Sequence, residues 1–254
     1  MLIKSSENIA KMRVASRLAA QVLEMIDPYV VPGVSTAKLD KICHDYIVNK
    51  LKAIPSTLNH HGFPASICTS VNHVVCHGIP SDTKILKEGD IINIDVTVKK
   101  DGFIGDTSKM FLLGKVKPHV NRLCVVAREC MNAGIEQIKP GASVGDIGYA
   151  IASHAKKNGY TIVREFGGHG IGETMWQSPD IPSFGDPGTG LKLATGMIFT
   201  VEPMVNLGSR HIQQLADGWT IITQDRKLSA QWEHTVLVTE NGFEILTLRN
   251  DELT

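Results

Sequence analysis

The chain has 254 residues, 43% of them hydrophobic and 20% charged, a balance typical of a globular domain in water. Lys plus Arg number 26 and Asp plus Glu number 26, so the formal net charge is zero, which argues against a domain-wide basic surface for nucleic acid. No run of about 18 apolar residues exists and the start, MLIKSSENIAKM, lacks an apolar signal core, so we expect neither a membrane span nor export.

Five cysteines are scattered without a CxxC pair, which indicates reduced thiols in the cytosol. Most of them fit the role of small buried hydrophobic residues, as free cysteines often do. They are Cys43, Cys68, Cys76, Cys124 and Cys130.

The first predicted elements are two helices. Apolar residues at helical spacing run from Ile9 to Ile26, and a Pro-Gly pair at 32–33 then opens a second helical stretch within 31–50. The same order recurs later, with helical spacing from Leu123 to Ile138 and a Pro-Gly pair at 140–141 opening the stretch 139–158. The two Pro-Gly pairs lie 108 residues apart, which indicates an internal repeat.

The repeat continues through the motifs between and after these helices. CHGI (76–79) matches GHGI (168–171), LKEGDIINIDV (86–96) matches LATGMIFTVEP (193–203), and DGF (101–103) matches DGW (217–219). His77 therefore corresponds to His169 and Asp95 to Glu202, while Asp106 and Glu233 each follow a predicted hairpin turn. We predict a single domain, 1–254, made of two halves at roughly 5–112 and 119–248 that are related by a pseudo-twofold axis.

The stretch INIDVTVKKDGFIGDTSKMFLL predicts two strands around a type I′ turn at Asp101-Gly102. A two-residue loop pairs Asp95 with Ser108 and therefore places Asp106 on the same sheet face as Asp95. A four-residue loop would also keep both carboxylates on one face, whereas a loop of odd length would separate them.

Two carboxylates on one sheet face repel each other, and burial makes this worse because isolated buried ions cost several kcal/mol each. A divalent cation between them resolves the conflict, and the pseudo-symmetry brings Glu202, Glu233 and His169 towards the same centre. Oxygen ligands with one imidazole favour two ions of Mn, Fe, Co or Zn sharing carboxylates. The alternative is that each acid alone is a solvated or capping residue and that His169 is an ordinary loop histidine.

The glycines around His169 are open to two interpretations. GGHGIG (167–172) is not the GxGxxG of a dinucleotide-binding loop, so we do not expect nucleotide binding. Instead, we expect the glycines flanking His169 to let the backbone approach a metal closely.

The six residues just described and their surrounding motifs resemble the methionine aminopeptidases across almost the whole chain. The motifs are VCHGIP, NIDVTVKKDGFIGDTSKMF, GHGIG, FTVEPM and SAQWEHTVLVT. Only 33 residues separate His169 from Glu202, which leaves no room for the helical insertion of type II enzymes and so favours the bacterial type I form. The resemblance implies the α/β (α+β) pita-bread fold, with two pseudo-twofold-related halves around a central antiparallel sheet and helices outside.

The resemblance also implies a function and a set of roles. We expect a cytosolic, monomeric metalloaminopeptidase that removes initiator methionine from nascent chains near the ribosome, without specific nucleic-acid or membrane partners. Asp95 would chelate one metal, Asp106 and Glu233 would bridge, and His169 and Glu202 would bind the other. Glu202 would also carry a proton, and His77 would face the substrate near the scissile peptide.

Trp176 departs from the family, which has a second substrate-facing histidine there that donates towards the scissile carbonyl. Trp offers an indole N–H but no acceptor and no positive charge. It could replace the donor, pack on the substrate side chain, leave the catalytic step weakened or simply anchor the loop. An alternative to a fully active enzyme is therefore a weakly active or non-catalytic peptide-binding relative.

The pocket for the first side chain also departs from the family. The resemblance assigns this pocket to Thr57, His60, Phe63, Cys68, Met175 and Trp219. Thr57, His60 and Met175 are unusual there, so altered specificity is an alternative to methionine. A third metal site at NHH (59–61) is a further alternative to a polar loop, and a prolidase or aminopeptidase P type of enzyme is another rival.

Overall fold

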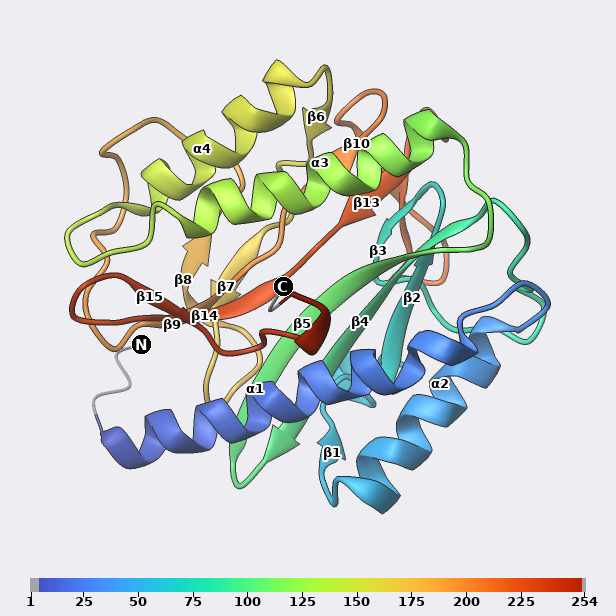
Figure 1. Ribbon diagram of the computed structural model, residues 1–254, viewed down its shortest axis with the longest axis horizontal. Helices are drawn as coiled ribbons and strands as arrows, with labels where there is room; N and C mark the ends of the chain where they lie inside the picture. Colours follow the sequence, from blue (N-terminus) through green and yellow to red (C-terminus); the bar gives the residue numbers. More distant parts are fainter. Residues whose placement is uncertain (1–4, 253–254) are drawn as a thin grey trace.

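The computed structural model describes residues 5–252, which form layers of antiparallel strands covered on the outside by two pairs of helices (Figure 1). One pair is α1 (Ser6–Ile26) with α2 (Thr36–Asp45), and the other is α3 (Pro118–Ile135) with α4 (Val144–Lys157). Shorter helical turns are η1 (Asp27–Tyr29), η2 (Tyr46–Lys50), η3 (His60–Gly62) and η4 (Asn250–Glu252). No helix among the described residues is long and apolar enough to span a membrane.

The predicted central sheet is divided into four ladders, and every strand pairing within residues 5–252 is antiparallel. The first has four strands, β1 (Ile54–Pro55), β4 (Ile91–Lys100), β2 (Ile67–Val71) and β5 (Phe103–Leu112). The second has five, β15 (Phe243–Ile245), β14 (His234–Val238), β9 (Ile198–Val201), β7 (Gly168–Gly170) and β8 (Gln177–Ile181). Two ladders of three are β13 (Ser229–Gln231), β10 (Met204–Asn206), β6 (Thr161–Ile162), and β11 (Ile212–Gln214), β12 (Ile221–Thr223), β3 (Val74–Cys76).

Each Pro-Gly pair precedes a helix, as the internal repeat predicts. Gly33 and Gly141 adopt left-handed φ angles of 95° and 87°, which end the preceding turn without a Cβ penalty. Two residues later, the Ser35 hydroxyl accepts from the Lys38 N–H, and Ser143 forms a capping box with Asp146. The sequence thus starts α2 and α4 at equivalent places, and both predicted helices are confirmed.

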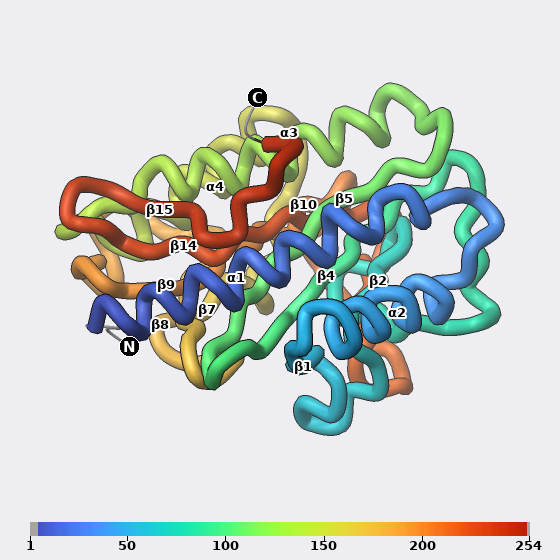
Figure 2. The backbone as a smooth tube through the Cα atoms, turned by 60° about the horizontal axis from the view of Figure 1, so that its bottom comes forward, coloured from blue at the N-terminus to red at the C-terminus, as the bar shows by residue number. Residues whose placement is uncertain are grey.

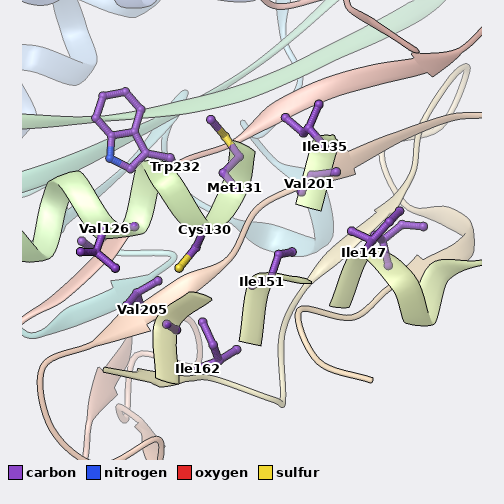
Figure 3. Packing of buried hydrophobic residues seen from close by; sticks show 14 of the residues in the cluster. Val126, Cys130, Met131, Ile135, Ile147, Ile151, Ile162, Val201, Val205 and Trp232 are labelled. Carbon is purple, nitrogen blue, oxygen red and sulfur yellow. The ribbon is translucent and has the colours of Figure 1, made fainter. Parts of the chain in front are cut away.

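Each helix pair covers its own hydrophobic core. Residues of α1 and α2 pack with β2 and β4 in one cluster, and α3 and α4 pack with β9, β13 and β14 in the other. Figure 3 shows Val126 and Cys130 of α3 near Val205 of β10, and Ile135 of α3 near Val201 of β9. All five cysteines are buried and free, as expected.

The β4–β5 hairpin has the predicted register. Asp101 and Gly102 have φ angles of 49° and 86°, as a type I′ turn requires, and Asp95 pairs with Ser108. Ser108 also forms a β-bridge to Glu233, which joins the four-stranded and five-stranded ladders. Figure 2 shows α1 lying across β4 and β5 of this hairpin. The predicted acidic residues therefore meet where the two ladders join.

Close packing of α1 on β5 generates the first prediction. A Cβ at Gly105 would collide with backbone atoms of Ser16, so Gly105→Ala should lower the free energy of unfolding by about 1–3 kcal/mol. In thermal unfolding this corresponds to about 2–4 °C per kcal/mol. Gly242→Ala is the matched control, because a Cβ there meets nothing within 4 Å. Equal melting temperatures for the two variants would contradict this packing.

Candidate active site

A cavity of about 860 Å³ is lined by residues from both halves of the chain. Every site residue that the sequence singled out lines it. They are Thr57, His60, Phe63, Cys68, His77, Asp95, Asp106, His169, Met175, Trp176, Glu202, Trp219 and Glu233. The folding of the chain thus gathers residues that lie up to 176 positions apart, from Thr57 to Glu233.

Three carboxylates form the floor of the cavity. Asp95 and Asp106 come from β4 and β5, and Glu233 lies between β13 and β14. One carboxylate oxygen of each lies within 4.8 Å of one from both others. Asp95 Oδ1 is buried and has no hydrogen-bond partner among the described residues, so it is free to bind a cation.

Glu202, which directly follows β9, and His169 of β7 complete the cluster. His169 Nε2 lies 3.5 Å from Glu202 Oε1 and 4.0 Å from Asp106 Oδ2. Glu202 is held at both oxygens, because Thr200 Oγ1 donates to Oε1 at 2.7 Å and Gln231 Nε2 donates to Oε2 at 3.2 Å. These two hydrogen bonds fix the orientation of the Glu202 carboxyl group.

Burial raises the pKa of every carboxyl in the cluster. The pKa of Asp106 rises to about 7 and that of Glu202 to about 8, with the negative charge of Asp106 adding to the burial of Glu202. Burial, followed by the negative charges of its neighbours, raises the pKa of Asp95 and of Glu233 well above the ordinary value. Deprotonated together, these groups need a cation, and their oxygens with one imidazole fit a divalent metal ion.

The two histidines are neutral at pH 7, because burial lowers the pKa of each to about 4. His169 Nδ1 lies 3.1 Å from the Gly170 carbonyl, which places the proton on Nδ1 and leaves the Nε2 lone pair facing the carboxylates. His77 stands at the opposite wall with a left-handed φ of 54°, and its ring meets Phe166 at 5.5 Å and Trp219 at 6.3 Å between centroids.

The glycines beside His169 are required by close backbone packing. A Cβ at Gly168 would collide with the Thr200 carbonyl, and one at Gly170 with the Ser178 carbonyl. They therefore allow β7 to pack tightly between β8 and β9, which positions the His169 side chain. The expectation that they let the backbone approach a metal stays a prediction.

Trp176 lies at the mouth of the cavity with 45% of its surface exposed. Its ring stacks on His61 at 6.0 Å and 12° and meets His60 edge-on at 4.9 Å. It also lies 6.3 Å from the His169 ring. Trp176 thus lies between η3 and His169, and its half-exposed ring is compatible with a role as a partly buried loop anchor.

The remaining wall of the cavity has an apolar end and a polar side. Phe63 and Cys68 pack together, and the Phe63 ring meets Trp219 edge-on at 5.2 Å. On the polar side are Thr57 and His60, and His60 Nε2 is buried without a hydrogen-bond partner among the described residues.

Sequence reasoning missed the residues that orient the carboxylates. Thr97 Oγ1 donates to Asp106 Oδ1 at 3.0 Å, and Thr200 and Gln231 hold Glu202 as described above. Thr97 lies two residues from Asp95, Thr200 two from Glu202, and Gln231 two from Glu233. The alternation of side chains along an extended segment was the available signal.

Comparisons with known proteins agree with this site. The sequence profile described as metallopeptidase family M24 matches residues 10–240. The methionine aminopeptidase of Escherichia coli strain K12 is 54% identical over 250 residues, which cover 98% of this chain and 95% of that protein. The crystal structure of methionine aminopeptidase from Rickettsia prowazekii has a TM-score of 0.95 at 52% identity and covers 98% of this chain and 100% of that one.

A more distant similarity extends to other enzymes. The prolidase from Pyrococcus furiosus has a TM-score of 0.77 at 20% identity, and the match covers 98% of this chain but 66% of the prolidase. This likeness shows a shared fold alone. Together the comparisons confirm the predicted pita-bread fold.

The raised pKa values predict how the metal-free protein responds to pH. Between about pH 6.5 and 8 the folded protein keeps protons on Asp106 and Glu202 that the unfolded chain has already lost, so its free energy of unfolding should fall as pH rises. Below about 6.5, the lowered pKa of His77 and of His169 acts in the opposite direction. Thermal unfolding in chelator measures this, and Glu202→Gln should flatten the decline. A stability that rises across this window would contradict the prediction.

Proposed function

The chain belongs to metallopeptidase family M24 and, within it, to the methionine aminopeptidases, and from this premise we propose that it removes the initiator methionine from new polypeptides. The observation that carries the proposal is the buried cluster of Asp95, Asp106, Glu202, Glu233 and His169 in one cavity. It is a metal-dependent hydrolase by membership, and the details below are our assignment.

Two divalent cations, of Mn, Fe, Co or Zn, would occupy the cluster. We assign Asp95 to one ion, Asp106 and Glu233 to both, and His169 with Glu202 to the other. The unpartnered Asp95 Oδ1 and the lone pair of His169 Nε2 support this assignment. When bound, the cations would lower the pKa of water and offset the negative charge that develops on the peptide carbonyl.

Glu202 is the group we assign to proton transfer. Its two oxygens are already oriented by Thr200 and Gln231, and it faces His169 across 3.5 Å. In this role it accepts the proton of the attacking water and returns it to the leaving amine. A fixed carboxyl group suits this work, because proton transfer needs a hydrogen-bond geometry within about 3 Å.

His77 and the wall beside it would hold the substrate. Because its pKa is near 4, His77 is neutral and can donate one hydrogen bond to the first peptide unit. The methionine side chain would lie between Phe63, Cys68 and Trp219 at the apolar end, beside Thr57 and His60, with the buried Met175 also lining the cavity. These walls suit an unbranched side chain with one weakly polar atom.

The wider setting follows the same proposal. We propose a monomer in the cytosol that acts on nascent N-termini near the ribosome, with no specific nucleic-acid partner and no membrane. The formal net charge of zero supports the part about nucleic acid. We also propose a single catalytic domain, 1–254, with halves at 5–112 and 119–248, which the two separate helix-covered clusters support.

The alternatives have less support. A weakly active or non-catalytic relative is not favoured, because all five ligand positions are filled and the relatives of about half identity are methionine aminopeptidases. Prolidase-type enzymes share the fold but match the chain at 20% identity. An altered first-residue specificity, suggested by Thr57, His60 and Met175, is tested by the choice of peptide.

Removal of one bridging carboxylate tests the metal assignment. Metal-free protein reloaded with Mn²⁺ should cleave Met-Ala-Ser, and Asp106→Asn should reduce kcat/KM by more than about 100-fold, since even outer-sphere changes reach that range. Asp101→Asn is the control, because it lies in the same hairpin and Asn suits its φ of 49°. Full activity of Asp106→Asn, or activity that survives chelators, would rule out this mechanism.

Trp176 is tested by restoring an imidazole. We expect Trp176→His to raise kcat by up to about 100-fold, because a hydrogen-bond donor towards a developing oxyanion is typically worth that much. Trp176→Phe keeps a ring for His61 and removes the N–H, so it should match the wild type. Unchanged kcat in Trp176→His together with a loss in Trp176→Phe would show instead that the indole N–H already donates.

A further inference from the structure

The last residues that the structure describes lie close to the backbone of Asp106 and Glu233. We call residues Leu246–Glu252 the C-terminal latch, and Figure 1 shows this dark red segment beside β5. Leu246 N–H donates to the Thr235 carbonyl at 2.9 Å. This hydrogen bond extends the β14–β15 ladder into the latch. The Arg17 guanidinium donates to the Leu248 carbonyl at 3.1 Å, and Asn250 N–H donates to Glu24 at 2.8 Å, so α1 holds the latch from outside.

Arg249 of the latch is fully buried and is linked through one threonine to the backbone of Glu233. Its Nη1 donates to Thr107 Oγ1 at 2.9 Å, and Thr107 Oγ1 in turn donates to the Glu233 carbonyl at 2.7 Å. Thr107 is the neighbour of Asp106 on β5. The Arg249 guanidinium therefore bonds Thr107, the neighbour of Asp106, directly. It is linked to the backbone of Glu233 through the Thr107 hydroxyl.

A second route leads from the latch to Asp106. The Thr247 hydroxyl accepts from Thr235 N–H at 3.0 Å, and the Thr235 hydroxyl donates to the Asp106 carbonyl at 2.7 Å. Both routes cross the join between β5 and Glu233, where Ser108 forms its β-bridge to Glu233. The latch is therefore hydrogen-bonded to both sides of this join.

Arg249 also brings a positive charge to this join. Its Nη2 donates to Glu252 at 2.9 Å, and its guanidinium lies 5.6 Å from the centre of the Trp232 ring. These contacts hold the guanidinium in place against the join.

We propose that Arg249 is a positioning residue for the metal centre, which sets the spacing of Asp106 and Glu233 through Thr107. The inference rests on the metal site of the proposed function but not on its peptide substrate. A latch of this kind affects metal affinity first and turnover only through it.

Calorimetric titration of the metal-free protein with Mn²⁺ tests the proposal. Arg249→Met should weaken Mn²⁺ binding by about 10–100-fold, the range for residues that orient metal ligands. Arg249→Lys should lie between this variant and the wild type, because it keeps the charge but loses the planar fork. Thr107→Val removes the shared hydroxyl without a large change of volume and should weaken binding in the same direction.

Arg128→Met is the matched control. Arg128 also bonds Glu252, at 3.3 Å, and lies 5.3 Å from the centre of the Trp232 ring, but its contacts do not include Thr107. It should bind Mn²⁺ like the wild type. Thermal unfolding in chelator checks that each variant is folded.

Three outcomes would overturn the proposal. These are wild-type Mn²⁺ affinity in folded Arg249→Met, an equal loss in Arg128→Met, and, if Arg249→Met does not fold, wild-type affinity in Thr107→Val. A wild-type protein that binds Mn²⁺ but leaves Met-Ala-Ser intact would disprove the proposed function without affecting the proposal for Arg249. If the wild type cleaves the peptide and neither Arg249→Met nor Thr107→Val changes the metal affinity, the proposal for Arg249 is wrong and the proposed function is retained.

Discussion

Repulsion among four buried carboxyl groups is the constraint on which the rest of this structure depends. Asp95, Asp106, Glu202 and Glu233 share one cavity, and burial alone makes each of them hard to ionise. Removing a charge from water costs several kcal/mol, and the protein recovers this only where an opposite charge is near. A divalent cation in the cavity would meet that need, which agrees with the membership of the chain in a metallopeptidase family.

The frame around the carboxylates is built to withstand this repulsion. Tight backbone packing fixes the strands, at Gly105 against α1 and at Gly168 and Gly170 between β8 and β9. The bridge between Ser108 and Glu233 ties the two large ladders together at the point of greatest charge. The four acidic residues and His169 therefore lie in or directly beside fixed strands, whereas Trp176 and His61 lie at the mouth of the cavity.

Much of this was readable from the sequence because it depends on local rules. The Asp-Gly turn determines the register of β4 and β5, and the period of two along a strand then puts Asp95 and Asp106 on one face. Because of the internal repeat, Glu202 and Glu233 are expected at equivalent positions in the second half. The remaining features depend on contacts between distant segments, which no local pattern encodes. The stacking of Trp176 on His61 and the contact of Arg249 with Thr107 belong to this class.

We propose that two divalent cations occupy the carboxylate cluster, and anomalous scattering from crystals grown with Mn²⁺ tests this most directly. Two peaks are expected. One would lie against Asp95, Asp106 and Glu233, and the other against His169 and Glu202 with the same bridging pair. Peaks absent from these carboxylates, or found instead at His60 and His61, would contradict it.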